Sequence, residues 1–76
     1  MEEKIREILA EVLPGTDLDS KTLADDGIID SMSVVNIVTE LAVEFDIEIS
    51  FEDLINENFN SVEAICALVE RLQSEG

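Results

Sequence analysis

The sequence predicts an all-α fold, a small bundle of three main helices and one short helix. Three stretches, over residues 2–13, about 31–45 and about 61–73, repeat apolar residues at the spacing of one helix face. Only one stretch alternates like a strand, and its four residues are too few to build a sheet. The 76 residues are expected to form one domain, 1–76, near the lower size limit for a self-sufficient core.

Residues 2–13 are expected to form the first helix. Its predicted inner face consists of Ile5, Ile8, Leu9, Val12 and Leu13. Pro14-Gly15 should end this helix, because neither residue continues a helix comfortably. A polar connection follows from Thr16 to about Asp30, and a connection this long needs apolar anchors. The candidate anchors are Leu18, Leu23, Ile28 and Ile29.

The second helix should open at Asp30 or Ser31, which are two candidate N-caps. Its predicted inner face consists of Val34, Ile37, Val38, Leu41 and Phe45. The strand-like stretch from Asp46 to Ile49 follows it.

A short third helix is expected from Ser50 or Phe51 through about Asn56. Asn60 is then expected to cap the last helix, with Glu63 three residues later completing a capping box. The predicted inner face of that helix consists of Val62, Ile65, Cys66, Val69 and Leu72. Residues 74–76 are expected to fray.

Charge restricts the partners of this chain. Nineteen acidic residues face four basic ones, and no Lys or Arg occurs between Thr22 and Glu70. Binding to nucleic acid is disfavoured, because phosphate contacts require Lys and Arg. Partners should instead present basic surfaces, unless the acidity only keeps the protein soluble. The longest apolar run, 64–69, is too short for a membrane span, and the acidic start is unlike a signal peptide. We therefore expect a soluble, cytoplasmic monomer without membrane insertion.

Few residues offer the usual means of catalysis. The sequence has no histidine, which excludes Ser-His-Asp and Cys-His arrangements. Cys66 is the only cysteine, so no internal disulfide or zinc site is expected, and its place on an apolar stripe suggests a structural role. Asp17-Leu18-Asp19 begins like a calcium loop, but Lys21 and Ile28 occupy ligand positions. We expect neither a metal site nor an enzyme.

Gly27-Ile28-Ile29-Asp30-Ser31-Met32 is the segment that stands out. A flexible glycine and two apolar residues lead into Asp-Ser where a long helix begins. In isolation, Asp30 and Ser31 could simply cap that helix.

Together with the length, the acidic surface and the order of helices, this segment resembles the acyl carrier and peptidyl carrier family. The resemblance covers essentially the whole chain. It is densest in "LADDGIIDSMSVVNIVTELAVEFDIEI", from Leu23 to Ile49, and returns in "NFNSVEAICALVERL". Asp30-Ser31-Met32 matches the family's Asp-Ser-Leu attachment site, with Met in place of Leu.

The resemblance implies that a phosphopantetheinyl transferase attaches 4′-phosphopantetheine from coenzyme A to Ser31. The thiol of the arm would then carry an acyl or aminoacyl group as a thioester. Asp30 would cap the helix and assist the transferase, and Met32 would offer partners an exposed apolar contact. The family's acidic docking surface would correspond here to Asp25, Asp26, Glu40 and Glu44.

Two departures from fatty-acid carriers bear on the cargo. Ser33 and Asn36 stand where those carriers commonly have acids, and Ile28-Ile29 resembles the Leu-Leu lead-in of D-alanyl carriers. The cargo therefore stays open between acyl chains of fatty acid, lipid or polyketide biosynthesis and amino acids. The loading partner would be an adenylating ligase, acyltransferase or synthase. An acidic helical interaction module, in which Ser31 only caps the helix, is the alternative of another class.

Overall fold

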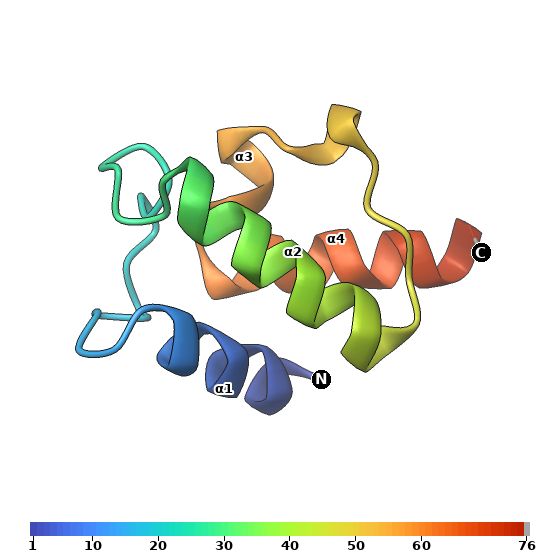
Figure 1. Ribbon diagram of the computed structural model, residues 1–76, viewed down its shortest axis with the longest axis horizontal. Coiled ribbons are helices and arrows are strands. Elements are labelled where there is room, and N and C mark those ends of the chain that lie inside the picture. The colour runs from blue at the N-terminus through green and yellow to red at the C-terminus, as the bar shows by residue number, and fades with distance from the viewer. Residues whose placement is uncertain (76) are drawn as a thin grey trace.

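The computed structural model describes residues 1–75. The elements are α1 (Glu2–Val12), α2 (Ser31–Phe45), the 3-10 helix η1 (Phe51–Asp53), α3 (Asn56–Phe59) and α4 (Val62–Glu75). Figure 1 shows α2 and α4 crossing the molecule, with α1 below α2 and the short α3 above. No strand forms within the described part of the chain. The predicted all-α class is confirmed.

The first helix ends as its sequence predicts. The Leu13 N–H donates to the Leu9 carbonyl oxygen with an N···O distance of 2.7 Å, which closes the last turn. Gly15 follows with φ +79, in the left-handed region that residues with a Cβ seldom adopt. Pro14-Gly15 therefore turns the chain away from the helix axis.

The second helix also has the predicted inner face. Ile37 and Leu41 are fully buried, and Val34, Val38 and Phe45 pack partly buried against the core. Asp46, with φ 52, ends the helix in the left-handed conformation. The alternating stretch that follows is an extended connection, whose Ile47 and Ile49 are half-buried.

The prediction of one short helix over residues 50–56 is wrong. Two separate turns, η1 and α3, occupy residues 51–59. Asp53 Oδ2 accepts hydrogen bonds from the Ser50 nitrogen at 3.2 Å and from Ser50 Oγ at 3.0 Å, which closes η1 as a single tight turn. The next helix cannot continue from it, because Ile55 is extended with φ −117 and ψ 152.

The predicted cap of the last helix is also wrong. Ser61 Oγ, not Asn60, accepts the hydrogen bond from the Ala64 N–H at 3.0 Å. The carboxylate of Glu63 pairs with Lys21 Nζ at 3.1 Å instead of completing a capping box. The helix continues through Ser74 and Glu75, which were expected to fray, while Gly76 lies outside the described residues.

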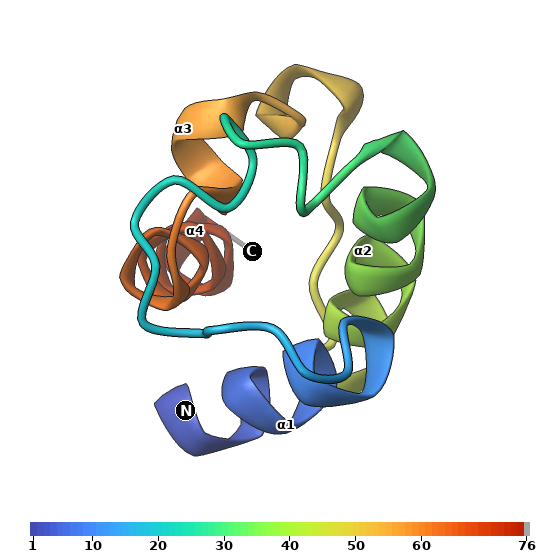
Figure 2. The same cartoon turned by 90° about the vertical axis from the view of Figure 1, so that its left-hand side faces the viewer.

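The core lies between the helices, which Figure 2 shows arranged around the centre of the molecule. Its buried members are Ile5, Ile8, Leu9, Leu13, Leu23, Ile29, Ile37, Leu41, Phe59, Val62, Ile65, Leu68 and Val69. The predicted inner faces and loop anchors supply most of them, but Phe59 and Leu68 were not predicted. Val12, Leu18, Cys66 and Leu72 are only partly buried. None of the helices over residues 1–75 is long and apolar enough to cross a membrane.

The prediction that Ile28 anchors the loop in the core is wrong, and the backbone shows why. The N–H of the next residue, Ile29, donates to the Leu23 carbonyl oxygen at 2.9 Å, and the Ile29 side chain is buried. Ile28 is left outside this contact with 39% of its surface exposed.

Candidate functional site

Ser31 is the first residue of α2, and its side chain is exposed to solvent. Asp30 immediately before it is the N-cap, with extended φ and ψ of −91 and −175. The Ser33 N–H donates to Asp30 Oδ1 at 2.8 Å, and the Val34 N–H donates to the Asp30 carbonyl oxygen at 2.9 Å. Of the two candidate caps, Asp30 performs the capping, and the hydroxyl of Ser31 is not used for it.

The carboxylate of Asp30 stays ionised more readily than an ordinary aspartate. The hydrogen bond from the Ser33 N–H lowers the pKa of Asp30 most, and the Ser33 hydroxyl lowers it further. A charged Asp30 at this position also interacts favourably with the positive end of the α2 dipole.

The surroundings of Ser31 offer no group that would activate its hydroxyl. The sequence has no histidine, and within residues 1–75 no cluster of three or more acids or cysteines is arranged to hold a metal ion. Burial raises the pKa of the Cys66 thiol, and the charges of Glu2 and Glu70 raise it further. This cysteine lies on α4, where it packs partly buried against the core.

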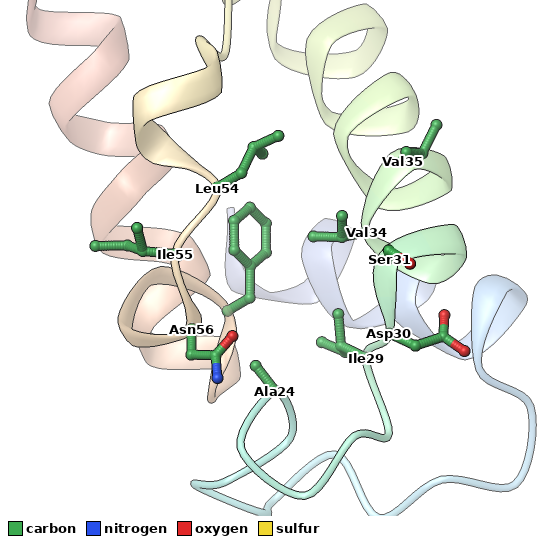
Figure 3. Close-up of a pocket in the computed structure, with 10 residues that line it drawn as sticks. Ala24, Ile29, Asp30, Ser31, Val34, Val35, Leu54, Ile55 and Asn56 are labelled. Carbon is green, nitrogen blue, oxygen red and sulfur yellow. The ribbon is translucent and has the colours of Figure 1, made fainter.

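A cavity of about 350 Å³ opens beside Ser31. Its lining residues are Ala24, Ile29, Asp30, Ser31, Val34, Val35, Leu54, Ile55, Asn56 and Phe59. Figure 3 shows Ile29 and Val34 on the α2 side, facing the segment of Leu54 and Asn56. Except for Asp30, Ser31 and Asn56, all the lining residues are apolar. The site thus combines an exposed hydroxyl with an adjoining apolar cavity.

The far wall of this cavity was not predicted from the sequence. Leu54 and Ile55 come from the link between η1 and α3, and Phe59 is the last residue of α3, all more than twenty residues after Ser31. The signal available in the sequence was the adjacent pair Leu54-Ile55, two large apolar residues. In the structure these two residues are 37% and 48% exposed. They gain a role only in the fold, where this segment and α2 line the same cavity.

The predicted docking residues lie on two elements. Asp25 and Asp26 belong to the loop before α2, while Met32, Glu40 and Glu44 extend along α2 over roughly 18 Å at 1.5 Å per residue. Met32 is 75% exposed. Glu44 faces α1, where Lys4 Nζ lies 3.9 Å from its Oε1.

The acids of the loop are held by internal hydrogen bonds. Asp25 accepts hydrogen bonds from two asparagine side chains, Asn56 at 3.1 Å and Asn60 at 3.0 Å. Asp26 Oδ2 accepts one from the Thr22 hydroxyl at 2.6 Å.

Comparison with known proteins identifies this arrangement. A family model described as a phosphopantetheine attachment site matches residues 3–69, which include α1 except its first residue, all of α2 and α3, and most of α4. The chain belongs to this family. Searches of curated proteins and of solved structures gave no significant match.

Membership in the phosphopantetheine attachment family decides the general role of the chain. Domains of this family are sites of covalent attachment of 4′-phosphopantetheine, and the thiol of that group carries intermediates as thioesters. The chain is therefore a carrier that works with a phosphopantetheinyl transferase and partner enzymes, and not an enzyme itself.

Proposed function

We propose that Ser31 is the residue that receives the 4′-phosphopantetheine arm. The observation that carries this proposal is an exposed hydroxyl at the first position of α2, with Asp30 doing the capping. A phosphodiester formed there meets the positive end of a 15-residue helix, which favours anions. The Ser31 oxygen would form a bond to the phosphorus of coenzyme A that bears the pantetheine arm. The bond from that phosphorus to the departing adenosine bisphosphate would break, and the transferase would take the serine proton.

For the cargo we propose an apolar acyl chain. The cavity beside Ser31 is lined mainly by apolar side chains, and its volume of about 350 Å³ is typical of small-ligand pockets. Moving an apolar chain from water into this cavity is favourable, whereas a charged amino group would lose its hydration there. An aminoacyl cargo would be expected to stay in solvent on the end of the arm.

The loading and receiving enzymes are proposed to approach along α2. They would be an acyl-activating ligase, acyltransferase or synthase of lipid, polyketide or related biosynthesis, with basic residues opposite the acidic side chains of Glu40 and Glu44. Met32 would contribute an exposed apolar contact beside the arm. The proposed carrier is a single-domain, cytoplasmic monomer.

The attachment site is tested by intact mass after incubation with coenzyme A and a broad-specificity phosphopantetheinyl transferase. Wild-type protein should gain one 4′-phosphopantetheine, and Ser31→Ala should gain none. Ser33→Ala is the matched control, because Ser33 lies two residues further along α2 and should not be needed for modification. Modification that survives in Ser31→Ala would refute the assignment.

The cargo is tested on the loaded protein. An acyl thioester buried in the cavity should hydrolyse more slowly than the same thioester on free pantetheine. Val34→Asp, which places a charge in the cavity wall, should remove this protection. Equal hydrolysis rates for free and protein-bound thioesters would favour a cargo that remains in solvent.

A further inference from the structure

Asn60 lies between α3 and α4, and its side chain bonds to the loop that leads to Ser31. Asn60 Oδ1 accepts hydrogen bonds from the backbone nitrogens of Ala24 at 3.0 Å and Asp25 at 2.8 Å. Its Nδ2 donates to Asp25 Oδ2 at 3.0 Å. Asn56 Nδ2 donates to the other oxygen of the same carboxylate at 3.1 Å. We call the side chains of Asp25, Asn56 and Asn60 the loop clasp.

The backbone supports the clasp at the same place. The Leu23 N–H donates to the Asn60 carbonyl oxygen at 2.9 Å, and the Leu23 carbonyl oxygen accepts from the Ile29 N–H at 2.9 Å. A hydrogen bond from the Gly27 N–H to the Ala24 carbonyl oxygen at 3.0 Å further closes the loop between Leu23 and Ile29. The end of this closed loop is Ile29, so Asp30 and Ser31 follow directly from a segment that Asn60 holds.

The clasp also joins two walls of the cavity. Ala24 and Ile29 line it from the loop, and Asn56 and Phe59 line it from α3. Figure 3 shows Ala24 and Asn56 close to the same end of the cavity. The other side-chain link between loop and α4, Lys21 with Glu63, is exposed by 70% and 80% and contributes little. With four hydrogen bonds against one, the clasp is the larger of these two side-chain connections, and it joins the loop to α3 and to the link between α3 and α4.

We propose that Asn60 is a positioning residue for the modification of Ser31. Its carboxamide holds the loop of residues 22–30 in the one conformation that the transferase binds. This inference rests on the proposed attachment at Ser31. Without the Asn60 side chain the loop samples other conformations, and the transferase must select the competent one. The apparent affinity falls in proportion to the competent fraction, so a loop that is ordered one tenth of the time raises KM about tenfold. Once the complex has formed, Ser31 and its Asp30 cap are unchanged, and kcat should stay close to that of the wild type.

The first comparison uses Asn60→Ala and a neighbouring asparagine. Asn58→Ala is the matched control: Asn58 Nδ2 donates to the Asp53 carbonyl oxygen at 2.8 Å, so the change removes an asparagine hydrogen bond without touching the loop. KM and kcat for the apo-protein are measured with coenzyme A and the transferase. Hydrogen exchange of the Ile29 amide reports the loop directly. Asn60→Ala should raise KM about tenfold with faster Ile29 exchange, and Asn58→Ala should change neither.

The second comparison exchanges the two clasp side chains. Asn60→Asp alone places two carboxylates against each other and should raise KM at least as much as Asn60→Ala. Asn60→Asp combined with Asp25→Asn restores every bond: the new carboxylate still accepts from Ala24 and Asp25 backbone nitrogens, and the new amide donates to it. The new amide oxygen at position 25 accepts from Asn56. The double variant keeps the net charge of −15 and should return KM to within about twofold of the wild type.

The outcomes separate this inference from the proposal on which it rests. If Asn60→Ala and Asn58→Ala have the same KM, or if the exchanged pair fails to restore KM, Asn60 is not a positioning residue. Should both single variants fold poorly, the exchanged pair alone decides. Modification that persists in Ser31→Ala would instead refute the attachment site and leave the clasp without this role.

Discussion

Asp30 caps α2, and this leaves the hydroxyl of Ser31 free of any capping role. The sequence offers both residues as candidate caps, and the one whose side chain can reach the Ser33 N–H becomes the cap. Asp30, in extended conformation outside the helix, reaches it at 2.8 Å. Ser31 already has helical conformation as the first residue of α2. A phosphodiester on Ser31 would therefore leave the capping bond intact.

The lowered pKa of Asp30 gives the cap a predictable pH dependence. Asp30→Asn keeps a hydrogen-bond acceptor but loses the charge, so it should lower the melting temperature at pH 7 by a few degrees. A group whose pKa is lower in the folded state than in the unfolded chain stabilises the fold at pH values above its unfolded pKa, which is about 3.9 for Asp. The difference between the two proteins should be constant from pH 7 to about pH 5, then shrink as the pH falls through the folded pKa. Thermal melts of both proteins from pH 7 to pH 2.5 measure it. A difference that does not change across that range would mean that the charge of Asp30 has no part in the cap.

Asn60 illustrates what could not be predicted at the scale of single residues. An asparagine followed three positions later by Glu63 fits a capping box, and the local pattern gives no reason to prefer another role. Ser61 is an equally suitable cap one position later, which frees Asn60 for the loop thirty-five residues earlier in the chain. Local sequence does not contain that contact. By contrast, the start of α2 at Ser31 and its cap at Asp30 could be predicted, because the cap residues directly precede the periodic apolar pattern.

At the scale of elements, the long helices were predictable and the connections between them were not. Periodic apolar residues identified α1, α2 and α4 to within a few residues, because burial of one face determines such helices. Residues 50–61 lack a repeating pattern. Their structure depends on Asp53, which closes η1 on Ser50 and also binds Arg71 of α4 with a distance of 3.0 Å from Oδ1 to the guanidinium nitrogen. That ion pair joins residues eighteen positions apart, so neither propensity nor local capping predicts it.

The outer face of α2 is the element-scale candidate for docking, and it is more apolar than expected. Met32, Val35 and Val43 are exposed by 75%, 58% and 80%, at helical spacings that place them on one side. Glu40 and Glu44 lie beside this stripe, toward α1. A partner suited to this face combines apolar contacts with basic residues at one margin.

Reversal of the charges beside the stripe should slow loading. Glu40→Lys with Glu44→Lys is expected to reduce the rate at low salt by about tenfold, because exposed charges mainly steer association. The wild-type rate should fall as salt is added, and the rate of the double variant should fall much less. Initial rates of loading by the cognate enzyme, from about 0.01 to 0.3 M sodium chloride, measure this effect.

A matched control for this variant is Glu3→Lys with Glu70→Lys. These two exposed acids lie on α1 and α4 and form no ion pair within residues 1–75, so their reversal changes the net charge equally. If the control slows loading as much as the α2 variant, overall charge and not this face governs recognition.

At the scale of the whole molecule, all four basic residues form ion pairs. Lys4, Arg6, Lys21 and Arg71 each pair with an acid, at distances from 3.0 to 3.9 Å. Their partners belong to α1, the first loop, η1 and the ends of α2 and α4. Nineteen acids outnumber these four bases, and residues 22–70, which contain Ser31, have no base. Three acids of that stretch, Glu44, Asp53 and Glu63, pair with these bases, and its other acids have no basic partner within residues 1–75.

This excess charge should make stability depend on salt. Added salt weakens both the repulsion among the acids and the attraction within the ion pairs. The ion pairs are mostly exposed and worth about 0–1 kcal/mol each, whereas the repulsion comes from a net charge of −15 on 76 residues. Repulsion should dominate, so the melting temperature should rise by several degrees as the screening length shortens from about 30 Å at 0.01 M to about 8 Å at 0.15 M.

Two variants separate repulsion from ion pairing in these melts. Glu3→Gln with Glu70→Gln removes two unpaired charges, so it should raise the melting temperature at 0.01 M salt and reduce the gain from added salt. Asp53→Asn can keep the contacts to Ser50 through its amide oxygen, but its NH2 group then faces Arg71, so the ion pair is lost. The Asp53 side chain is only 17% exposed. The substitution should lower the melting temperature at both salt concentrations, because a shielded pair is screened less than exposed charges. Coincident wild-type melts at 0.01 and 0.15 M would show that the acids are already far enough apart for water alone to screen them, and the repulsion argument would then fail.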